Sequence, residues 1–295
     1  MTYSLTANQI PTSSISGPLG FKSRVDLVFE KDPDGRSYLS RQYADYPFHV
    51  CRPHYFDREP SGMATLYLQS CSGGLFEDDN LLCSLAVKPG AAAHLTSQAS
   101  TIVHSSRKNR SANYKALICA ERNSFVEYLP DPIILFPQAR LDTSIDVILD
   151  PTAIVIISDA FILHDPDNAN RRPGLLATSI CARTFEGKLL IADRSRIFAD
   201  DFELDKPGVM GFWICYGSLM VLNRFKPADE LCSRLREVLA NSSEIYAGFS
   251  TLPNEAGVWA RFLARDAISL RSAMLRAWKE SRKFLTGYEP DLRRK

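Results

Sequence analysis

The fold class of this chain is decided by residues 64–100, ATLYLQSCSGGLFEDDNLLCSLAVKPGAAAHLTSQAS. This stretch contains three short runs that are rich in apolar, β-branched and aromatic residues, and these runs predict strands at 64–69, 81–87 and 93–97. A glycine pair and a Pro-Gly dipeptide, which are turn signals, separate the runs. No helical period joins them, so we expect short strands connected by turns.

The same rhythm of apolar runs and turn clusters continues from Gly20 to about Asn223. Eight further runs predict strands at residues 24–29, 114–119, 125–128, 145–149, 154–158, 179–184, 188–192 and 212–222. Because no helical period interrupts them, an alternating βαβ chain is excluded, and a sandwich, a barrel or a wound β-architecture is favoured. The lack of a fixed-period repeat disfavours a regular propeller or solenoid.

The pattern becomes helical after residue 225. A proline suited to a first helical turn and apolar residues at helical spacing predict an amphipathic helix over 227–240. A second, longer helix is predicted over 258–285, where Gly287 follows as the stop signal. We expect its apolar face to bury Trp259, Phe262 and Trp278.

The strands and helices are expected to form one domain. Residues 1–16 are polar and show no apolar period, which predicts a loose tail. No long flexible linker separates the strands from the helices, so we expect a single domain over 17–295. Its β-rich part is 17–225 and its helical part is 226–295. The predicted fold class is therefore mainly β, with two α-helices at the C-terminal end.

The composition argues against several functional classes. The 295 residues include 35 Lys and Arg against 34 Asp and Glu, and a formal net charge of +1 argues against a nucleic-acid binder. The first twenty residues lack signal-peptide features and the apolar runs are short, so neither export nor membrane insertion is expected. Seven irregularly spaced cysteines without a CxxC pair favour reduced thiols, which predicts a cytoplasmic protein.

No enzyme motif is present in the sequence. There is no GxxxxGK[ST] phosphate-binding loop, so nucleotide hydrolysis is not expected. There is no GxSxG nucleophile motif, and the five histidines lack the close ligand pairing that catalytic zinc requires. We therefore expect a protein that is not an enzyme and that binds no cofactor tightly.

One acidic cluster stands out in the segment Ser72–Asn80, where Glu77, Asp78 and Asp79 follow a flexible glycine pair between two predicted strands. Adjacent carboxylates raise one another's proton affinity, and a divalent cation is one way to relieve that repulsion. The alternative is a solvated acidic turn, which is the commoner role of a charge run.

Several segments spread along the chain together form a family pattern. In chain order they are Ser72–Asp79, Val87–Ala91, Leu95–Thr101, Glu127–Pro132 with Phe136, Ala139 and Arg140, Ser158-Asp159, Pro207–Gly211, and the residues Val258, Arg261, Leu270, Arg271 and Trp278. These segments resemble the urease accessory protein UreD family, also called UreH. The resemblance covers nearly the whole chain from Val25 to Leu285, and its Leu-Pro-Asp-Pro block is the most specific part.

The resemblance implies a non-enzymatic scaffold with an extended, largely β, multi-stranded helicoid fold and helices on the C-terminal side. UreD-like proteins join UreF and the GTPase UreG, dock on the urease apoprotein and help to guide nickel into its active site. The missing phosphate-binding loop is consistent with this division of labour, because the GTP chemistry belongs to a partner. Any Ni²⁺ is expected to bind transiently and not as a resident cofactor.

The resemblance also suggests a nickel path. Oxygen ligands without His or Cys hold nickel weakly, which suits an ion that must leave again. The expected transient relay consists of Glu77, Asp78 and Asp79. Neutral oxygens along the same path would come from three residues whose alternative role is that of hydrogen-bonded strand residues, namely Thr96, Ser97 and Gln98.

The C-terminal end is expected to bind a partner. Residues 258–295 carry seven Arg and three Lys against two Asp and two Glu, a local positive excess that suits an acidic partner surface. A solvated helix face is the alternative. The candidate partner-binding residues are Arg271, Arg276 and Arg282.

Three departures from the family pattern leave a second function open. Glu77 and Asp78 stand where the family usually has glycines, residues 164–173 replace a Gly-Arg segment, and Gly174-Leu175 lacks the glutamate usual there. The alternative function is that of a divergent interaction protein, which keeps the UreD fold and its docking surface but does not transfer nickel or serves a different client.

Overall fold

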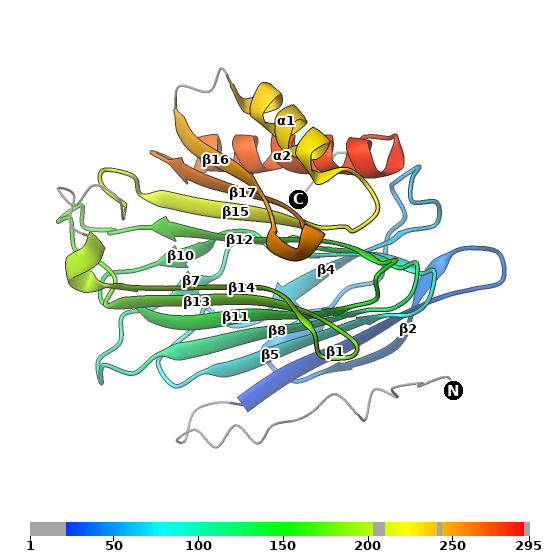
Figure 1. The fold of residues 1–295 in the computed structure, drawn as a ribbon. Helices are drawn as coiled ribbons and strands as arrows, with labels where there is room; N and C mark the ends of the chain where they lie inside the picture. The colour runs from blue at the N-terminus through cyan, green and yellow to red at the C-terminus, as the bar shows by residue number, and fades with distance from the viewer. Residues whose placement is uncertain (1–21, 203–209, 241–243, 292–295) are drawn as a thin grey trace.

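The computed structural model describes residues 22–202, 210–240 and 244–291, and it shows two facing β-sheets with two helices on one of them (Figure 1). The prediction of a mainly β protein with two C-terminal helices is confirmed. The predicted loose tail at 1–16 lies outside the described residues, and the single-domain boundaries stay a prediction.

Within the described ranges sheet I has seven strands, and its five central strands run parallel to one another. The two outer strands pair antiparallel with their neighbours. In spatial order the strands are β14 (Leu189–Phe198), β13 (Leu175–Thr184), β11 (Arg140–Leu149), β8 (Ala112–Ala120), β5 (Asn80–Val87), β1 (Lys22–Lys31) and β2 (Ser37–Ala44).

Sheet II combines parallel strands at its centre with antiparallel strands at both ends. In spatial order its main strands are β16 (Ile245–Thr251), β17 (Gly257–Ala264), β15 (Cys215–Leu222), β12 (Ile154–Leu163), β9 (Phe125–Tyr128), β6 (Ala92–Ser97), β4 (Ala64–Ser70) and β3 (Phe48–Val50). Two short strands extend it through pairing to the end of β12, namely β10 (Ile133–Leu135) and β7 (Ile102–Val103).

The chain winds between the two sheets as a solenoid-like coil. The parallel strands of sheet I alternate along the sequence with those of sheet II, so each turn of the coil contributes one strand to each sheet. Along the narrow edge between the sheets, Val103 pairs with Leu135 and Leu135 with Leu163, at separations of 32 and 28 residues. The sequence lacks a fixed-period repeat and therefore disfavoured a regular solenoid. The coil was not predicted because its turns differ in length.

All eleven predicted strands overlap observed strands, and six observed strands were not predicted. β3, β7 and β10 contain only two or three residues, too few to show a period. Nearly every side chain of β2 and β16 is exposed or only partly buried, so neither strand shows an apolar run. The sixth strand, β17, lies where a helix was predicted.

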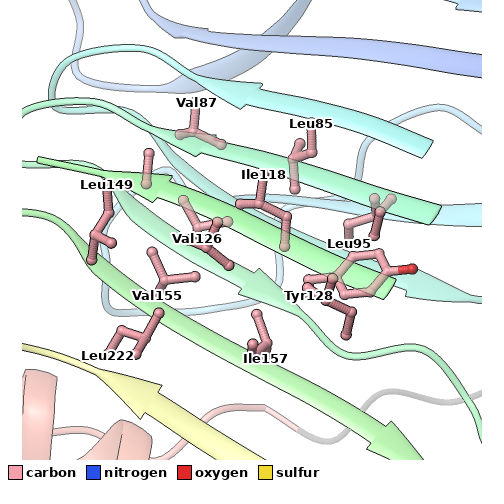
Figure 2. Close-up of a cluster of buried hydrophobic side chains, with 14 of the residues drawn as sticks. Leu85, Val87, Leu95, Ile118, Val126, Tyr128, Leu149, Val155, Ile157 and Leu222 are labelled. Carbon is pink, nitrogen blue, oxygen red and sulfur yellow. The ribbon is translucent and has the colours of Figure 1, made fainter. Parts of the chain in front are cut away.

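The largest core lies between the two sheets (Figure 2). Leu85 and Ile118 of sheet I and Val126 and Ile157 of sheet II contribute to it, and each is at least 98% buried. Along β11 every second side chain is buried, which is the pattern of a strand with one face against a core. Burial of this apolar surface stabilises the coil by about 25 cal/mol for each Å² removed from water.

The helices α1 (Ala228–Leu239) and α2 (Ala267–Thr286) cover the outer face of sheet II (Figure 1). α1 confirms the predicted helix over 227–240 to within one residue at each end. The C-cap of α2 is Gly287 in a left-handed conformation, as predicted. No helix within the described ranges is long and apolar enough to cross a membrane. The described residues also include the 3₁₀-helices η2 (Ala199–Phe202) and η3 (Pro253–Glu255).

The prediction of one helix over 258–285 was wrong in its first part. Residues 257–264 form β17, in which Val258 and Phe262 are buried towards the helices while Trp259 lies on the other face. This alternation has the period of a strand. α2 begins only at Ala267, because the side chain of Asp266 accepts a hydrogen bond from the backbone N–H of Ser269 and so forms an N-cap.

Gly257 provides a test of the pairing between β15 and β17. Its φ is +136°, and a Cβ there would lie 1.9 Å from the carbonyl oxygen of Val221. Gly257→Ala should lower the free energy of unfolding by about 2–4 kcal/mol, because the backbone must move. Gly248→Ala on β16 is the matched control, since its Cβ would meet nothing within 4 Å. Equal stability of the two variants in urea denaturation would contradict this pairing.

Candidate functional site

A buried ion pair joins the C-terminal helix to sheet II. Arg282 on α2 donates from Nε and Nη2 to the two carboxylate oxygens of Glu127 on β9, at 2.7 and 2.6 Å, and both side chains are fully buried. Trp278, one helical turn earlier, donates from Nε1 to Glu127 Oε1 at 2.8 Å. His94 on β6 places Nδ1 2.5 Å from Glu127 Oε2. One carboxylate therefore links two strands to one helix.

The Arg282 guanidinium also reaches the loop between β3 and β4. Its Nη1 donates to the carbonyl oxygen of Glu59 at 3.0 Å and lies 3.4 Å from the Asp57 carboxylate, which is also buried. Burial alone would raise the pKa of Glu127, but the charge of Arg282 and the hydrogen bonds from His94 and Arg282 outweigh it. The pKa of Glu127 is held well below its ordinary value of 4.5, so the pair is fully charged at neutral pH.

The structure separates the three arginines that were expected to bind a partner. Arg271 is exposed. Arg276 is partly buried and donates from Nη1 to the carbonyl oxygen of Val238 on α1 at 3.3 Å. Arg282 is not available to a partner, because a charged residue on the buried side of an amphipathic helix requires an internal counter-ion, here Glu127. The prediction of an exposed role for Arg282 is therefore corrected.

A cavity of about 280 Å³ lies between the two sheets. Tyr114 and Thr143 of sheet I line one side, and Tyr128 and Asp159 of sheet II line the other. The cavity reaches the surface at residues 98–100, which line it and are exposed. It lies beyond the ends of β6 and β9, where sheet II lacks continuous strands to fill the space.

Two of the three residues expected to supply neutral oxygens lie in the wall of this cavity, namely Ser97 and Gln98. Their role in a nickel path stays a prediction. Thr96 does not line this cavity, because its side chain points to the other face of the strand, where its hydroxyl donates to the carbonyl oxygen of Leu129 at 2.7 Å. Successive side chains of a strand alternate between faces, so the three residues cannot all share one path wall.

Asp159 is a partly buried carboxylate of the cavity wall. Its Oδ1 is inaccessible to solvent and finds no hydrogen-bond donor among the described residues. Burial raises the pKa of Asp159 to about 6, although a hydrogen bond from Ser218 and the charge of Arg261 act in the opposite direction. The phenols of Tyr114 and Tyr128 also face each other here, with their oxygens 3.4 Å apart.

A second cavity of about 170 Å³ lies on the other face of sheet II, beneath α2. Thr96 and the exposed Arg271 line it. Three residues line both cavities, namely Pro130, Asp131 and Ser158. The two cavities therefore approach each other where β9 has ended, and no strand of sheet II separates them at that point.

The acidic cluster lies outside both cavity walls, and each of its carboxylates has a partner of its own. Glu77 accepts hydrogen bonds from the Ser106 hydroxyl at 2.9 Å and from the backbone N–H of Lys108 at 2.7 Å. Asp78 forms a salt bridge with Arg110. Asp79 accepts a hydrogen bond from the backbone N–H of Phe76 at 2.8 Å.

These contacts have different effects on the acidity of the cluster. The hydrogen bond from the Lys108 backbone is the largest influence on Glu77 and lowers its pKa, whereas partial burial raises the pKa of Asp79. Within the described ranges no group of three or more His, Cys, Asp or Glu side chains is arranged to hold a metal ion. The geometry of Glu77, Asp78 and Asp79 is that of a loop anchor, and their role as a nickel relay stays a prediction.

Comparison with known proteins identifies the family of this chain. The family described as UreD urease accessory protein matches residues 22–295. The chain belongs to this family. A Pseudomonas syringae pv. syringae protein named urease accessory protein UreD 1 is 39% identical over 94% of this chain and 97% of its own length. Its Methylorubrum populi counterpart is 36% identical over 97% and 96%, and a Photorhabdus laumondii UreD is 26% identical over 94% and 87%.

The sequence pattern assigned no role to two carboxylates that the structure places in the interior, namely Asp159 in the cavity wall and Glu127 in the buried ion pair. Asp159 follows Val155 and Ile157 at every second position, so a carboxylate on the inward face of an apolar strand was the available signal. Glu127 stands between apolar and aromatic neighbours in β9 and gave the same signal. A buried carboxylate needs a partner or a shifted pKa, and these two residues illustrate both outcomes.

Glu127→Gln tests the buried ion pair of this UreD-family protein. The variant leaves the charge of Arg282 buried without its counter-ion and should lower the free energy of unfolding by about 3–5 kcal/mol at pH 7. The matched control is Glu121→Gln, which removes a partly exposed pair with Lys88 and should cost about 1 kcal/mol or less. Urea denaturation provides the comparison, and similar costs for both variants would contradict the described network.

The same ion pair predicts a pH dependence. The pKa of Glu127 in the folded protein lies below its ordinary value, so the stability it contributes is present above about pH 4.5 and is lost as the pH falls below that value. In urea denaturation across this range, the difference in stability between the wild type and Glu127→Gln should shrink as the pH falls.

Proposed function

We propose that this protein is a urease maturation factor that passes nickel through the cavity between its sheets. The single observation that supports this role most directly is the composition of the cavity wall. The wall combines the carboxylates of Asp131 and Asp159 with the neutral oxygens of Ser97 and Gln98. Membership of the UreD family points to urease as the protein that receives the nickel, because the family members are named urease accessory proteins.

The chemistry of the wall suits an ion in transit. Carboxylate, hydroxyl and amide oxygens are hard ligands that hold Ni²⁺ less tightly than imidazole or thiolate. An ion that must be released to a client cannot be bound deeply, so a weak series of oxygen ligands favours movement. The carboxylate of Asp159, with one oxygen lacking a donor, offers the ion a negative charge inside the protein.

The two cavities supply a route across sheet II in this proposal. The cavity beneath α2 meets the central cavity at Pro130, Asp131 and Ser158, and the central cavity opens at residues 98–100. Nickel would therefore enter on the α2 side and leave at the opening, or move in the reverse direction. Glu77, Asp78 and Asp79 would contribute only if an arriving cation displaced the hydrogen bonds and the salt bridge that they already make.

The protein acts in this proposal as a non-enzymatic member of a cytoplasmic assembly. Its partners are UreF-like and UreG-like proteins and the urease apoprotein, and the UreG-like partner hydrolyses GTP. Arg271 contributes to docking, since it is exposed and lies at the end of α2 that borders the second cavity. The competing function is that of an interaction protein with the same fold, which assembles but passes no nickel.

Asp159→Asn separates these two functions. In a host that depends on this protein for urease activation, the variant should form the same complexes, while the nickel content of the purified urease should fall several-fold. The amide keeps the shape of the side chain but removes its negative charge. Asp142→Asn is the matched control, because Asp142 lies on the same strand as Thr143 but does not line the cavity.

The measured quantities are the nickel content of each urease preparation and the amount of each partner protein that co-purifies with the variant. Urea denaturation establishes that both variants are folded. Normal nickel loading by Asp159→Asn, with normal assembly, would exclude passage by way of this carboxylate and favour the pure interaction protein.

Charge reversal at Arg271 tests the docking role of α2. Arg271→Glu should weaken capture of an accessory partner by about tenfold, because it replaces attraction to an acidic surface by repulsion. Arg276 is left unchanged because it contacts α1. A substitution there could weaken helix packing as well as docking, and the two effects could not be separated. The control is Lys188→Glu, a charge reversal at an exposed residue of the turn between β13 and β14. Unchanged partner capture by purified Arg271→Glu would leave Arg271 as a solvated side chain.

A further inference from the structure

β16 is an unprotected edge strand of sheet II. It stands last in the strand order of this sheet and, among the described residues, pairs only with β17 (Figure 1). Its seven residues, Ile245–Thr251, include no charged residue and no proline. A free strand edge presents unpaired N–H and C=O groups, and proteins usually block such an edge with charges, proline, a bulge or a very short strand.

The other strands at the ends of the two sheets are blocked in these ways. β3 and β7 have only three and two residues. β2 carries Arg41 and pairs with β1 across a bulge. β14 carries Asp193, Arg194 and Arg196. Within the described ranges β16 is therefore the strand edge best suited to accept a further strand.

The direction of the backbone groups of β16 follows from the turn that ends it. The N–H of Leu252 donates to the carbonyl oxygen of Gly257 at 2.8 Å, so position 252 faces β17. Backbone groups alternate in direction along a strand, and the odd-numbered positions of β16 therefore point away from the sheet. The carbonyl oxygen of Phe249 agrees with this, because Arg236 of α1 donates to it from Nη2 at 3.0 Å.

A second copy of the same strand fits this edge. When two copies of β16 pair antiparallel about Gly248, Ala247 of each bonds to Phe249 of the other through their outward groups. Gly248 then lies opposite its own copy, and Tyr246 lies opposite Ser250. A Cβ at Gly248 would meet nothing within 4 Å, so the centre of this pairing is open. Tyr246, which is 68% exposed in the single chain, gains a cross-strand neighbour.

The exposed charges of α1 beside this edge are self-complementary. Arg236 and the next residue, Glu237, are both exposed, and neither forms a salt bridge with another residue of the described chain. A two-fold axis through the pairing places the two copies of α1 on the same face of the joined sheet with their directions reversed. Each Arg236 can then meet the Glu237 of the other copy, which is the reciprocal contact of a two-fold interface.

We infer that this chain forms a two-fold symmetric dimer in which two copies of β16 pair antiparallel about Gly248. The pairing joins two copies of sheet II into one continuous sheet. Main-chain hydrogen bonds supply the affinity, and two identical strands can meet without repulsion because neither carries a charge. The dimer uses neither cavity and needs no nickel, so it goes beyond the proposed function and does not rest on it.

Charge at position 248 tests this pairing. Sedimentation equilibrium of the wild-type chain should give a mass that rises with concentration to twice that of one chain. Gly248→Lys and Gly248→Glu should each weaken the dimer about tenfold at low salt, because like charges then lie opposite each other. An equimolar mixture of the two variants should restore the dimer, since a lysine then faces a glutamate. Gly248→Ala is the neutral control and should dimerise like the wild type.

Arg236→Glu tests the contact between the two helices. It should raise the dissociation constant of the dimer about tenfold, and the double variant Arg236→Glu, Glu237→Arg should recover wild-type affinity because it exchanges the two charges. Thermal denaturation establishes that each variant is folded.

Two results would overturn the inference. A wild-type chain that stays monomeric would leave this edge to a strand of another protein, and a Gly248→Lys variant that dimerises normally would exclude the pairing about Gly248. Neither result bears on the nickel content of urease, which tests the proposed function separately.

Discussion

The buried carboxylate of Glu127 is the constraint on which the C-terminal half of the molecule depends. It accepts hydrogen bonds from Arg282 and Trp278 of α2 and lies beside His94 of the neighbouring strand. An ion pair removed from water is stabilising only while all its members are present, because any one of them left alone is a desolvated charge. The helix that covers sheet II is therefore held in one position, and with it the cavity beneath that helix.

The two cavities have a common origin in the short strand β9. It ends at Tyr128, and the segment that follows leaves sheet II without a strand between β6 and β12. Side chains such as Asp131 and Ser158 fill part of this break and line both cavities. An interruption that would weaken an ordinary sheet is tolerated here, because α2 closes one face and sheet I closes the other. The interior can thus keep polar residues such as Asp159 within a β-rich core.

The acidic cluster shows how tertiary contacts change the meaning of a charge pattern. Glu77 and Asp78 are occupied by the loop at 105–110, and this loop exposes Arg107 and Lys108. The exposed Arg107 and Lys108 balance the charges of Glu77 and Asp79, which accept hydrogen bonds only from neutral donors. Local charge sums describe composition, but the outward field depends on which charges are paired within the fold.

The sequence by itself determined the β-rich class, all eleven predicted strands, α1 and membership of the UreD family, because each of these depends on local periodicity or on a string of residues in order. Only the tertiary structure decided that residues 257–264 form a strand, that Arg282 is internal and that Asp159 lines a cavity. Each of these depends on partners distant in the sequence. A short amphipathic run forms a strand or a helix according to the element that it packs against. A charged side chain is buried only where another element supplies a counter-ion.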